Sequence, residues 1–256
     1  MQSKKTIILL GYNYINAILD LVSSNDIFVL IRKSDIKFFQ SVDLEKLKVA
    51  MGIRLFISDD YKFDIISLSN SGFYSTLITL GWRRLIDVDQ FSNMENLINV
   101  HPALLPEYKG YHPVPYILLN REKFHGITAH RITNQMDAGE IILRKEFPIN
   151  HFSTVLSLQY IVNKEMYEFL SDLLMLIRVG IKELFPNHDH QTKILAPKRK
   201  PEDSEVGLSE TVEEMFYKVK ASDSNRFPAF FIMNGEKVNI RLYRDINADR
   251  QTEFDI

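Results

Sequence analysis

Residues 6–22 read Thr-Ile-Ile-Leu-Leu-Gly-Tyr-Asn-Tyr-Ile-Asn-Ala-Ile-Leu-Asp-Leu-Val, an apolar run that stops at a glycine and is followed by a second apolar pattern. The first run, Thr6–Leu10, is uninterrupted, which is typical of a parallel strand buried on both faces. The second pattern recurs at helical spacing, at Ile15, Ile18, Leu19 and Val22. A strand followed at once by a helix predicts an α/β unit at the start of the chain.

The same alternation continues through the next 130 residues. Further strand-like runs lie at Ile27–Ile31, Arg54–Ile57, Phe63–Leu68, Leu77–Leu80, Asn96–Val100, Gly126–Ile132 and Ile141–Phe147. Charged segments compatible with helices, such as Asp43–Met51, separate the early runs. The pattern predicts an α/β fold with an open, mostly parallel sheet and helices on both faces. A long helix is expected to begin at a Ser153 cap and to run to about Arg178, with Gly180 marking its end.

The composition changes at Ala196–Glu205, where Pro-Lys-Arg-Lys-Pro-Glu-Asp-Ser-Glu is typical of a linker. A short helix is expected over Thr211–Ala221. Two strand-like runs follow at Phe227–Met233 and Lys237–Tyr243, and a polar tail ends the chain. The Asn234-Gly235 pair between the two runs is a strong hairpin signal. We therefore predict a main domain over residues 1–195, then a linker and a small, mainly-β C-terminal subdomain over residues 196–256.

Bulk composition narrows the classes of function. The 256 residues contain no cysteine, which removes thiol nucleophiles, thiolate metal sites and disulfides together. The net charge is −2, and from Pro201 onward 12 acidic residues outnumber 7 Lys and Arg, so a basic surface for nucleic acid is not indicated. No run approaches the roughly 20 apolar residues that a membrane span requires. The first apolar run is too short for a signal peptide, so we expect a cytoplasmic protein without membrane association.

Two segments are the most informative about chemistry: Asn99-Val-His-Pro-Ala-Leu-Leu-Pro-Glu-Tyr-Lys-Gly110 and Asp137-Ala-Gly-Glu-Ile-Ile. Asn99 and His101 lie two residues apart at a strand end, so their side chains leave the same face, where open parallel sheets bind ligands. An imidazole can transfer a proton near neutral pH, a carboxylate can orient it, and an amide N–H can stabilise an oxyanion. By themselves, the residues allow either a reaction site or an ordinary loop histidine and turn aspartate.

Both segments resemble signatures of the enzymes that use 10-formyltetrahydrofolate, namely Asn-x-His-Pro-Ser-Leu-Leu-Pro-x-x-x-Gly and Asp-x-Gly-x-Ile. Asp137 lies 36 residues after His101, as in that family, and Ala103 replaces the family's serine. The resemblance covers about Lys5–Phe147 and implies the Rossmann-like formyltransferase fold. It implies that Asn99, His101 and Asp137 are catalytic, that 10-formyltetrahydrofolate is the co-substrate, and that no metal takes part.

The resemblance also places the folate. In the family a slot for the pterin ring is built partly from backbone groups, at the position held here by Leu80-Gly-Trp-Arg-Arg-Leu-Ile86. The residues assigned to folate on this basis are Arg84, Leu85, Ile86 and Leu97. For any single one of them, a strand end followed by a helix start is an equal alternative.

Three groups within the family formylate different amines. Glycinamide ribonucleotide formyltransferases lack a C-terminal subdomain and carry a Gly-rich phosphate loop, where this chain has Gly11-Tyr-Asn-Tyr. Methionyl-tRNA formyltransferases have a larger and more basic C-terminal domain. The third group formylates nucleotide-linked amino (dideoxy) sugars for surface polysaccharide of the O-antigen type. Residues 197–205 and Arg226-Phe-Pro-Ala-Phe-Phe resemble parts of the member that acts on UDP-4-amino-arabinose, so this group is favoured.

The expected substrate is therefore an amino sugar linked to dTDP, UDP or GDP. The residues assigned to the sugar or its diphosphate are Lys109, Tyr111 and His112, which end or follow the catalytic loop. For Tyr111, a loop aromatic covering the core is an equal alternative. A solvated surface is favoured over nucleotide contact for three residues: Tyr217, Lys220 and Arg226. Apolar positions in the predicted hairpin allow a homodimer.

A hydrolase is the main alternative of a different class. Water would replace the amine at the same triad, and formate would be released. The family's folate hydrolases carry an extra N-terminal regulatory domain, and the first strand here begins at Thr6. A sugar-binding protein without activity would be expected to have a damaged triad, whereas all three residues are present. Transfer to an amine is therefore the favoured prediction.

Overall fold

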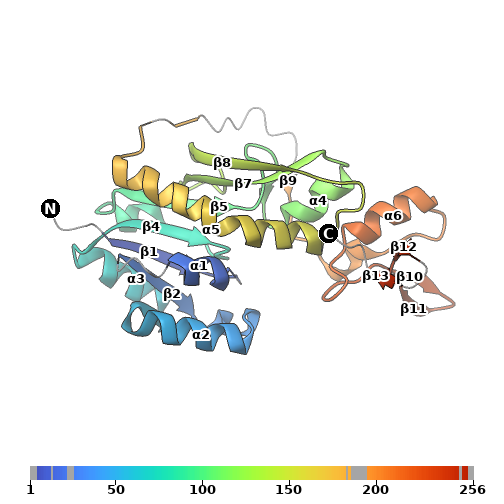
Figure 1. Cartoon of the computed structure of the whole chain (residues 1–256), viewed down its shortest axis with the longest axis horizontal. Helices are drawn as coiled ribbons and strands as arrows, with labels where there is room; N and C mark the ends of the chain where they lie inside the picture. Colours follow the sequence, from blue (N-terminus) through green and yellow to red (C-terminus); the bar gives the residue numbers. More distant parts are fainter. Residues whose placement is uncertain are drawn as a thin grey trace. The chain divides into compact units, whose positions relative to one another are not determined.

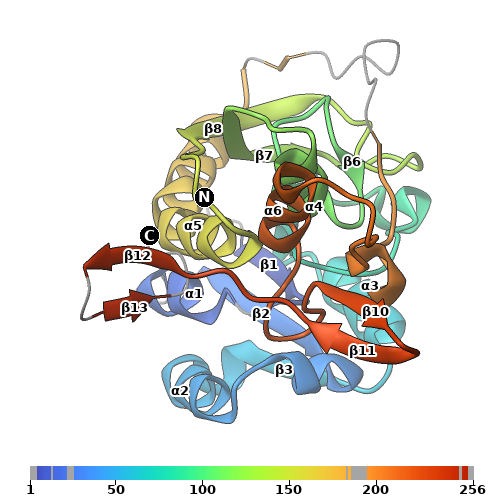
Figure 2. The same ribbon diagram turned by 90° about the vertical axis from the view of Figure 1, so that its right-hand side faces the viewer.

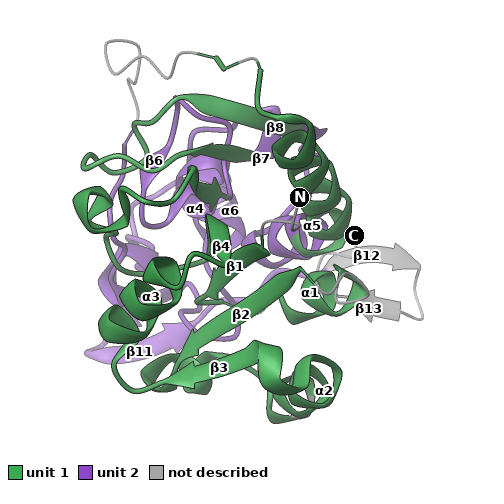
Figure 3. Ribbon diagram, turned by 90° about the vertical axis from the view of Figure 1, so that its left-hand side faces the viewer, with its two compact units in different colours: residues 1–101, 127–145, 163–191 green, residues 102–126, 146–162, 192–256 purple. Residues whose placement is uncertain are grey.

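The structure is a computed structural model that describes residues 5–12, 14–21, 26–182, 184–185, 195–247 and 250–252. The chain divides into two compact units, which Figure 3 colours separately. Unit 1 contains residues 1–101, 127–145 and 163–191, and unit 2 contains residues 102–126, 146–162 and 192–256. Unit 2 thus joins the C-terminal region to two earlier segments of the chain. The functional division at residue 195 stays a prediction.

A seven-stranded sheet is the frame of the fold, with the order β3-β2-β1-β4-β5-β7-β8 (Figure 1). Its strands are β1 (Lys5–Leu10), β2 (Ile27–Arg32), β3 (Leu55–Ser58), β4 (Tyr74–Leu80), β5 (Asn96–His101), β7 (Phe124–Arg131) and β8 (Ile141–Pro148). The strands from β3 to β5 pair in parallel, whereas β7 runs antiparallel to β5. The predicted open, mostly parallel sheet is confirmed.

Helices lie on both sides of this sheet. In Figure 3, α1 and α2 lie on one side of the strands and α3 on the other, as predicted. The helices are α1 (Ile15–Leu21), α2 (Ser41–Met51), α3 (Tyr61–Asn70), α4 (Pro113–Leu119), α5 (Val155–Val179) and α6 (Val212–Lys220). Short 3-10 turns are η1 (Lys33–Phe38), η2 (Gly52–Arg54), η3 (Val88–Phe91) and η5 (Pro201–Ser204). Among the described residues, no helix combines the length and apolarity needed to cross a membrane.

The core of unit 1 is built on the central strands. Every residue of β4 is buried, and all of β1 after Lys5 is buried, so side chains on both faces are withdrawn from water. Ile7, Leu9 and Leu77 are fully buried and share one cluster with Leu30 and Ile65. Burying an aliphatic side chain of this size contributes about 1.5–3 kcal/mol. The uninterrupted apolar runs were therefore a reliable signal for these two strands.

One predicted strand is wrong. Phe63–Leu68 lies within the helix α3. The Asp60 side chain caps this helix by accepting a hydrogen bond from the Phe63 backbone N–H at 3.2 Å. Ile65 and Ser69, four residues apart, are its buried positions, whereas Phe63 is 68% exposed. The buried side chains follow the period of a helix, although the letters alone resemble a strand.

The long predicted helix is confirmed as α5, but its cap is not Ser153. The Thr154 hydroxyl accepts from the Ser157 backbone N–H at 3.2 Å, and the Ser157 hydroxyl accepts from the Thr154 N–H at 2.8 Å. These reciprocal bonds satisfy two backbone donors at the start of the helix. The Ser153 hydroxyl accepts instead from the Asn150 N–H, which stabilises the preceding turn. Gly180, with φ of 86°, ends the helix as predicted.

Unit 2 contains short strand pairs in addition to α4 and α6. They are β6 (Lys109–Gly110) with β9 (Leu195–Ala196), β10 (Phe230–Met233) with β11 (Glu236–Asn239), and β12 (Arg244–Asn247) with β13 (Arg250–Thr252). β10 and β11 form the predicted hairpin (Figure 2), and the turn residues Asn234 and Gly235 both have positive φ. The pair β12–β13 lies where a polar tail was predicted.

Lys220 corrects another expectation, because it is buried rather than solvated. Only 3% of the residue is exposed, and its Nζ donates to the His151 carbonyl at 2.5 Å. The rings of Phe216 and Tyr217 have their centroids 5.1 and 4.9 Å from this nitrogen. Burial disfavours the ammonium and lowers the pKa of Lys220 from 10.5 to about 8.

This pKa predicts how stability depends on pH. Below pH 8 the folded chain bears the cost of a buried ammonium. Between pH 8 and 10.5 the unfolded chain holds more protons at Lys220 than the folded chain, so the wild type gains stability as the pH rises. Replacing Lys220 with Met removes this gain. In urea unfolding at pH 7 and pH 9.5, the stability of Lys220→Met relative to wild type should therefore fall at the higher pH. Lys46→Met, at an exposed position of α2, should show no such trend, and a constant difference for Lys220→Met would contradict the assignment.

Candidate active site

The pairing of β5 with β7 brings the first candidate residues together. In the antiparallel register Asn99 lies opposite His130, and His101 lies opposite Thr128. His101 and His130 are 4% and 2% exposed. Both imidazoles are therefore held in a largely dry environment beside an amide, at the carboxyl end of β5.

Asp137 reaches the same place through a tight turn between β7 and β8. Its φ is 51°, a left-handed conformation that aspartate tolerates better than most residues. The Arg131 N–H donates to the Glu140 carbonyl at 2.9 Å, which closes the turn. A Cβ atom at Gly139 would lie 1.8 Å from the Arg131 carbonyl oxygen, so only glycine allows this close return of the chain.

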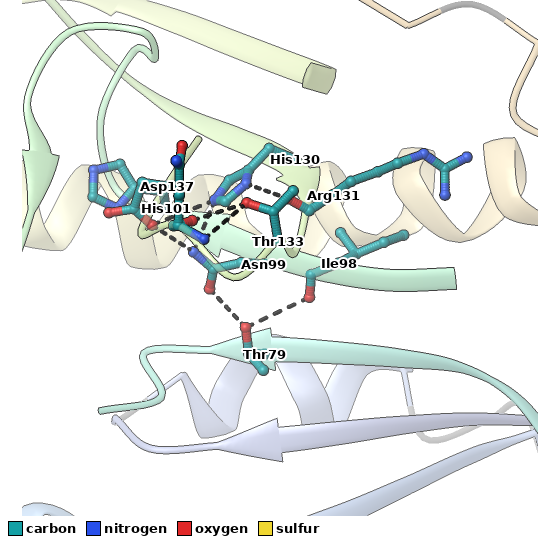
Figure 4. Close-up of polar contacts among 9 residues, drawn as sticks. Thr79, Ile98, Asn99, His101, His130, Arg131, Thr133 and Asp137 are labelled. Carbon is teal, nitrogen blue, oxygen red and sulfur yellow. Dashed lines mark hydrogen bonds and ion pairs between the residues drawn. The ribbon is translucent and has the colours of Figure 1, made fainter. Parts of the chain in front are cut away.

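The three predicted catalytic side chains meet at the Asp137 carboxylate (Figure 4). The Asn99 Nδ2 donates to Asp137 Oδ1 at 3.2 Å, and His101 Nδ1 lies 3.5 Å from Asp137 Oδ2. A fourth group, His130 Nε2, lies 3.5 Å from Asp137 Oδ1. One acceptor-only carboxylate thus holds the amide and can orient the His101 imidazole, which is the arrangement that proton transfer beside a stabilised oxyanion requires.

Thr79 and His130 belong to this cluster but were not predicted. The Thr79 hydroxyl donates to Asn99 Oδ1 at 2.6 Å, and Asn99 Nδ2 lies 3.0 Å from His130 Nε2. Both residues sit in strands whose sequences show ordinary buried patterns, Thr79 in β4 and His130 in β7. Both strands were predicted, but neither side chain could be placed beside Asn99, because strand register is not readable from a single sequence.

Of the four predicted folate residues, two line a cavity of about 740 Å³ in unit 1 and two do not. Its lining residues are Arg32, Lys33, Ser34, Ser58, Asp59, Tyr61, Lys62, Arg84 and Leu85. Arg84 and Leu85 are exposed there, with Leu85 at 73%. Ile86 instead belongs to the buried cluster of unit 1, and Leu97 packs against that cluster.

The cavity is strongly basic. Four of its lining residues carry positive charge and only Asp59 carries a negative one, so it favours an anionic ligand. Arg32 is its most constrained cation: it is 6% exposed, and its Nε donates to Asp35 Oδ2 at 2.7 Å. The Arg32 guanidinium carbon also lies 5.4 Å from the Tyr61 ring centroid and 5.0 Å from the Trp82 ring centroid. The two rings and the Asp35 carboxylate together hold the guanidinium in one place.

The residues predicted to meet the sugar lie in unit 2 and differ in exposure. Tyr111 is 60% exposed, whereas Lys109 is 6% exposed. His112 Nδ1 accepts a hydrogen bond from the Arg199 backbone N–H at 2.8 Å. This loop is fixed by the pairing of β6 with β9, where a Cβ at Gly110 would lie 2.4 Å from the Ala196 carbonyl oxygen.

Metal binding was not predicted for this site. In the part of the chain that the structure describes, histidine, aspartate and glutamate side chains form no group of three or more arranged to hold a metal ion.

The chain is similar in sequence to known proteins. Residues 74–174 match the formyl transferase family. The methionyl-tRNA formyltransferase of Thermotoga maritima is 34% identical over 145 residues, which cover 57% of this chain and 45% of that protein. The chain thus matches less than half the length of this relative.

Solved structures share the fold. The N-formyltransferase from Helicobacter canadensis, in complex with folinic acid and dTDP-3-aminofucose, superposes with a TM-score of 0.76 at 19% identity, covering 94% of this chain and 88% of that one. A sugar N-formyltransferase from Shewanella gives a TM-score of 0.71 at 18% identity, covering 93% and 97%. At this level of identity the likeness concerns the fold.

The turn that carries Asp137 predicts a stability effect. Gly139→Ala forces the backbone away from the Arg131 carbonyl, and overpacking of this kind costs about 1–3 kcal/mol. The midpoint of urea unfolding measures it. Gly207→Ala is a matched control, because the nearest atoms to its new Cβ belong to the flexible Glu210 side chain, and it should stay within about 0.5 kcal/mol of wild type. An unchanged midpoint in Gly139→Ala would show that the turn is not constrained as described.

Proposed function

Because residues 74–174 of this chain belong to the formyl transferase family, we propose that the protein transfers a formyl group from 10-formyltetrahydrofolate to the amine of a nucleotide-linked amino sugar. The observation that carries the proposal is the convergence of Asn99, His101 and Asp137 within the matched segment. Surface polysaccharide of the O-antigen type is the proposed destination of the product. A cytoplasmic location and a homodimer belong to the same proposal.

In the proposed reaction the amine nitrogen bonds to the formyl carbon, the bond from that carbon to folate N10 breaks, and one proton moves from the amine to N10. Asn99 donates an N–H to the oxyanion of the tetrahedral intermediate, and protonated His101 stabilises the same charge. Asp137 orients the His101 ring through Nδ1 and assists the proton transfer. All three roles use groups that the cluster already holds together.

The basic cavity supports a role in folate binding. Folate ends in a glutamate, whose carboxylates suit a cavity lined by Arg32, Lys33, Lys62 and Arg84. We propose that Arg84 and Leu85 contact this tail. For Ile86 and Leu97, which are packed in or against the core, we propose a contribution to the slot through backbone groups.

The class of amine rests on the fold comparisons and on charge. This chain covers most of the length of two structural neighbours, one named a sugar N-formyltransferase and the other solved with dTDP-3-aminofucose. It covers less than half the length of the methionyl-tRNA relative. From Pro201 onward the local charge is −5, and a tRNA-binding surface needs the opposite sign. Lys109, Tyr111 and His112 are the proposed contacts to the sugar or its diphosphate. The nucleotide is dTDP, UDP or GDP.

Methionyl-tRNA formyl transfer is the second candidate, favoured by the 34% identity to the Thermotoga protein. Glycinamide ribonucleotide and water are the remaining acceptors. One screen separates all four: the purified chain is incubated with 10-formyltetrahydrofolate and, in turn, nucleotide-linked 3- and 4-amino sugars, methionyl-tRNA, glycinamide ribonucleotide, or no amine. A mass gain of one formyl group on an amino sugar supports the proposal. Rapid formate release without an amine identifies a hydrolase.

His101→Ala should lower formyl transfer by about 10²–10⁴-fold, because the variant lacks its proton-transfer and charge-stabilising group. Binding of the nucleotide sugar, measured by calorimetry, should stay near the wild-type value. Circular dichroism confirms that the fold is intact. A transfer rate close to wild type would exclude the proposed role of this cluster.

Arg84→Ala should raise the KM for 10-formyltetrahydrofolate about tenfold with little change in kcat, because a charge-assisted hydrogen bond contributes about 1.5–3 kcal/mol. Lys46→Ala, an exposed cation on α2 outside the cavity, is the matched control. The tail itself is tested with 10-formyltetrahydropteroate, which lacks glutamate and should give the same KM with wild type and Arg84→Ala. An equal KM for the complete folate in both proteins would remove Arg84 from the site.

A further inference from the structure

Thr79 lies directly beside Asn99. The two residues are partners in the parallel register of β4 and β5, so their side chains leave the same face of the sheet. Thr79 is 3% exposed, and its hydroxyl donates to Asn99 Oδ1 at 2.6 Å (Figure 4). The other acceptor near this hydroxyl, the Ile98 carbonyl, is 3.5 Å away. The single hydroxyl proton therefore serves the Asn99 amide.

The opposite end of the amide is fixed by acceptors. Asn99 Nδ2 lies 3.2 Å from Asp137 Oδ1 and 3.0 Å from His130 Nε2. His130 Nδ1 lies 2.8 Å from the Arg131 carbonyl oxygen, which can only accept, so Nδ1 carries the proton. In the neutral ring Nε2 is then an acceptor and receives the second N–H of Asn99. Every polar atom of the amide has a partner in this one orientation.

We propose that Thr79 is a positioning residue, which fixes the orientation of the Asn99 amide with its nitrogen toward Asp137 and His130. The inference rests on the proposed function, in which one of the two Asn99 N–H groups exchanges its partner in the cluster for the oxyanion. Thr79 itself touches neither the amine nor the folate in this proposal. It acts through Asn99.

The flipped orientation of the Asn99 amide explains why the Thr79 hydroxyl determines which orientation is populated. A flipped Asn99 amide would turn its oxygen toward the Asp137 carboxylate, and two acceptors would then face each other. The same oxygen could accept a hydrogen bond from His130 if that ring moved its proton to Nε2. With Thr79 present, the flip also leaves the hydroxyl proton only the distant Ile98 carbonyl. With valine at position 79, the observed orientation leaves Asn99 Oδ1 without its donor from β4. The observed orientation is then favoured less than in wild type, and the flipped one becomes more populated.

The ring nitrogens of His130 report this orientation directly. The experiment uses the full chain with ¹⁵N-labelled histidine, and His130→Gln identifies the resonances of His130. Wild type and Thr79→Ser, which keeps a hydroxyl, should both show the proton on Nδ1. Thr79→Val, which keeps the shape and removes the hydroxyl, should show a mixture with the proton partly on Nε2. A wild-type ring protonated on Nε2, or a Thr79→Val ring identical to wild type, overturns the proposal.

Kinetics give a second readout, with 10-formyltetrahydrofolate and dTDP-3-aminofucose as the probe pair. Thr79→Val should lower kcat about 10–100-fold with the KM nearly unchanged, less than the full loss of an oxyanion donor, and Thr79→Ser should restore it. A wild-type kcat in Thr79→Val overturns the proposal. Absence of transfer in wild type counts against the proposed function, while the ring nitrogens still decide the role of Thr79. If Thr79→Val does not fold, the wild-type ring alone provides the test.

Discussion

The antiparallel pairing of β7 with β5 is the constraint on which the candidate site depends. Parallel strands β4 and β5 place Thr79 next to Asn99. On the other side of β5, the antiparallel register sets His130 against Asn99. The segment after β7 leaves beside Leu97, where the Ile132 N–H donates to the Leu97 carbonyl at 2.8 Å, and it returns Asp137 to both residues. Side chains from three neighbouring strands and one turn therefore meet in a single cluster.

Burial restricts how the polar groups of this cluster can be arranged. Asp137, His101 and His130 are each less than 10% exposed, so water does little to satisfy their polar atoms. An unpaired buried polar atom costs about 1–3 kcal/mol, and every change of tautomer or amide orientation must therefore be matched by a neighbour. The Asp137 carboxylate can only accept hydrogen bonds, whereas the Asn99 amide can flip and each imidazole can carry its proton on either nitrogen. The amide and the imidazoles are ordered around the carboxylate.

Much of the fold was predictable because short stretches of the sequence indicate it. The uninterrupted runs at β1 and β4 indicated buried parallel strands, and Asn234-Gly235 indicated the hairpin. One failure is also local in origin: Phe63–Leu68 has the apolar residues of a strand, whereas the structure has a helix there with Asp60 as its cap. The convergence of Asn99, His101 and Asp137 was predicted from the two motifs, and their catalytic role stays a prediction. Thr79 and His130 were not predicted, since each becomes part of the site only through strand register, a property of pairs of distant segments.

Under the proposed function, the residues of the reaction cluster and the residues that contact the amine substrate lie in different units. Asn99, His101, Asp137 and their partners all lie in unit 1, and most of the segment that matches the family lies there as well. The proposed sugar contacts belong to unit 2, where β9 pairs with β6 and the Arg199 N–H binds His112. β9 and Arg199 lie beyond the segment that matches the family. Under the proposed function, a change in the C-terminal region that moved β9 would also move the loop of residues 109–112, because β6 pairs with β9. The choice of amine can then change without a change in the reaction cluster.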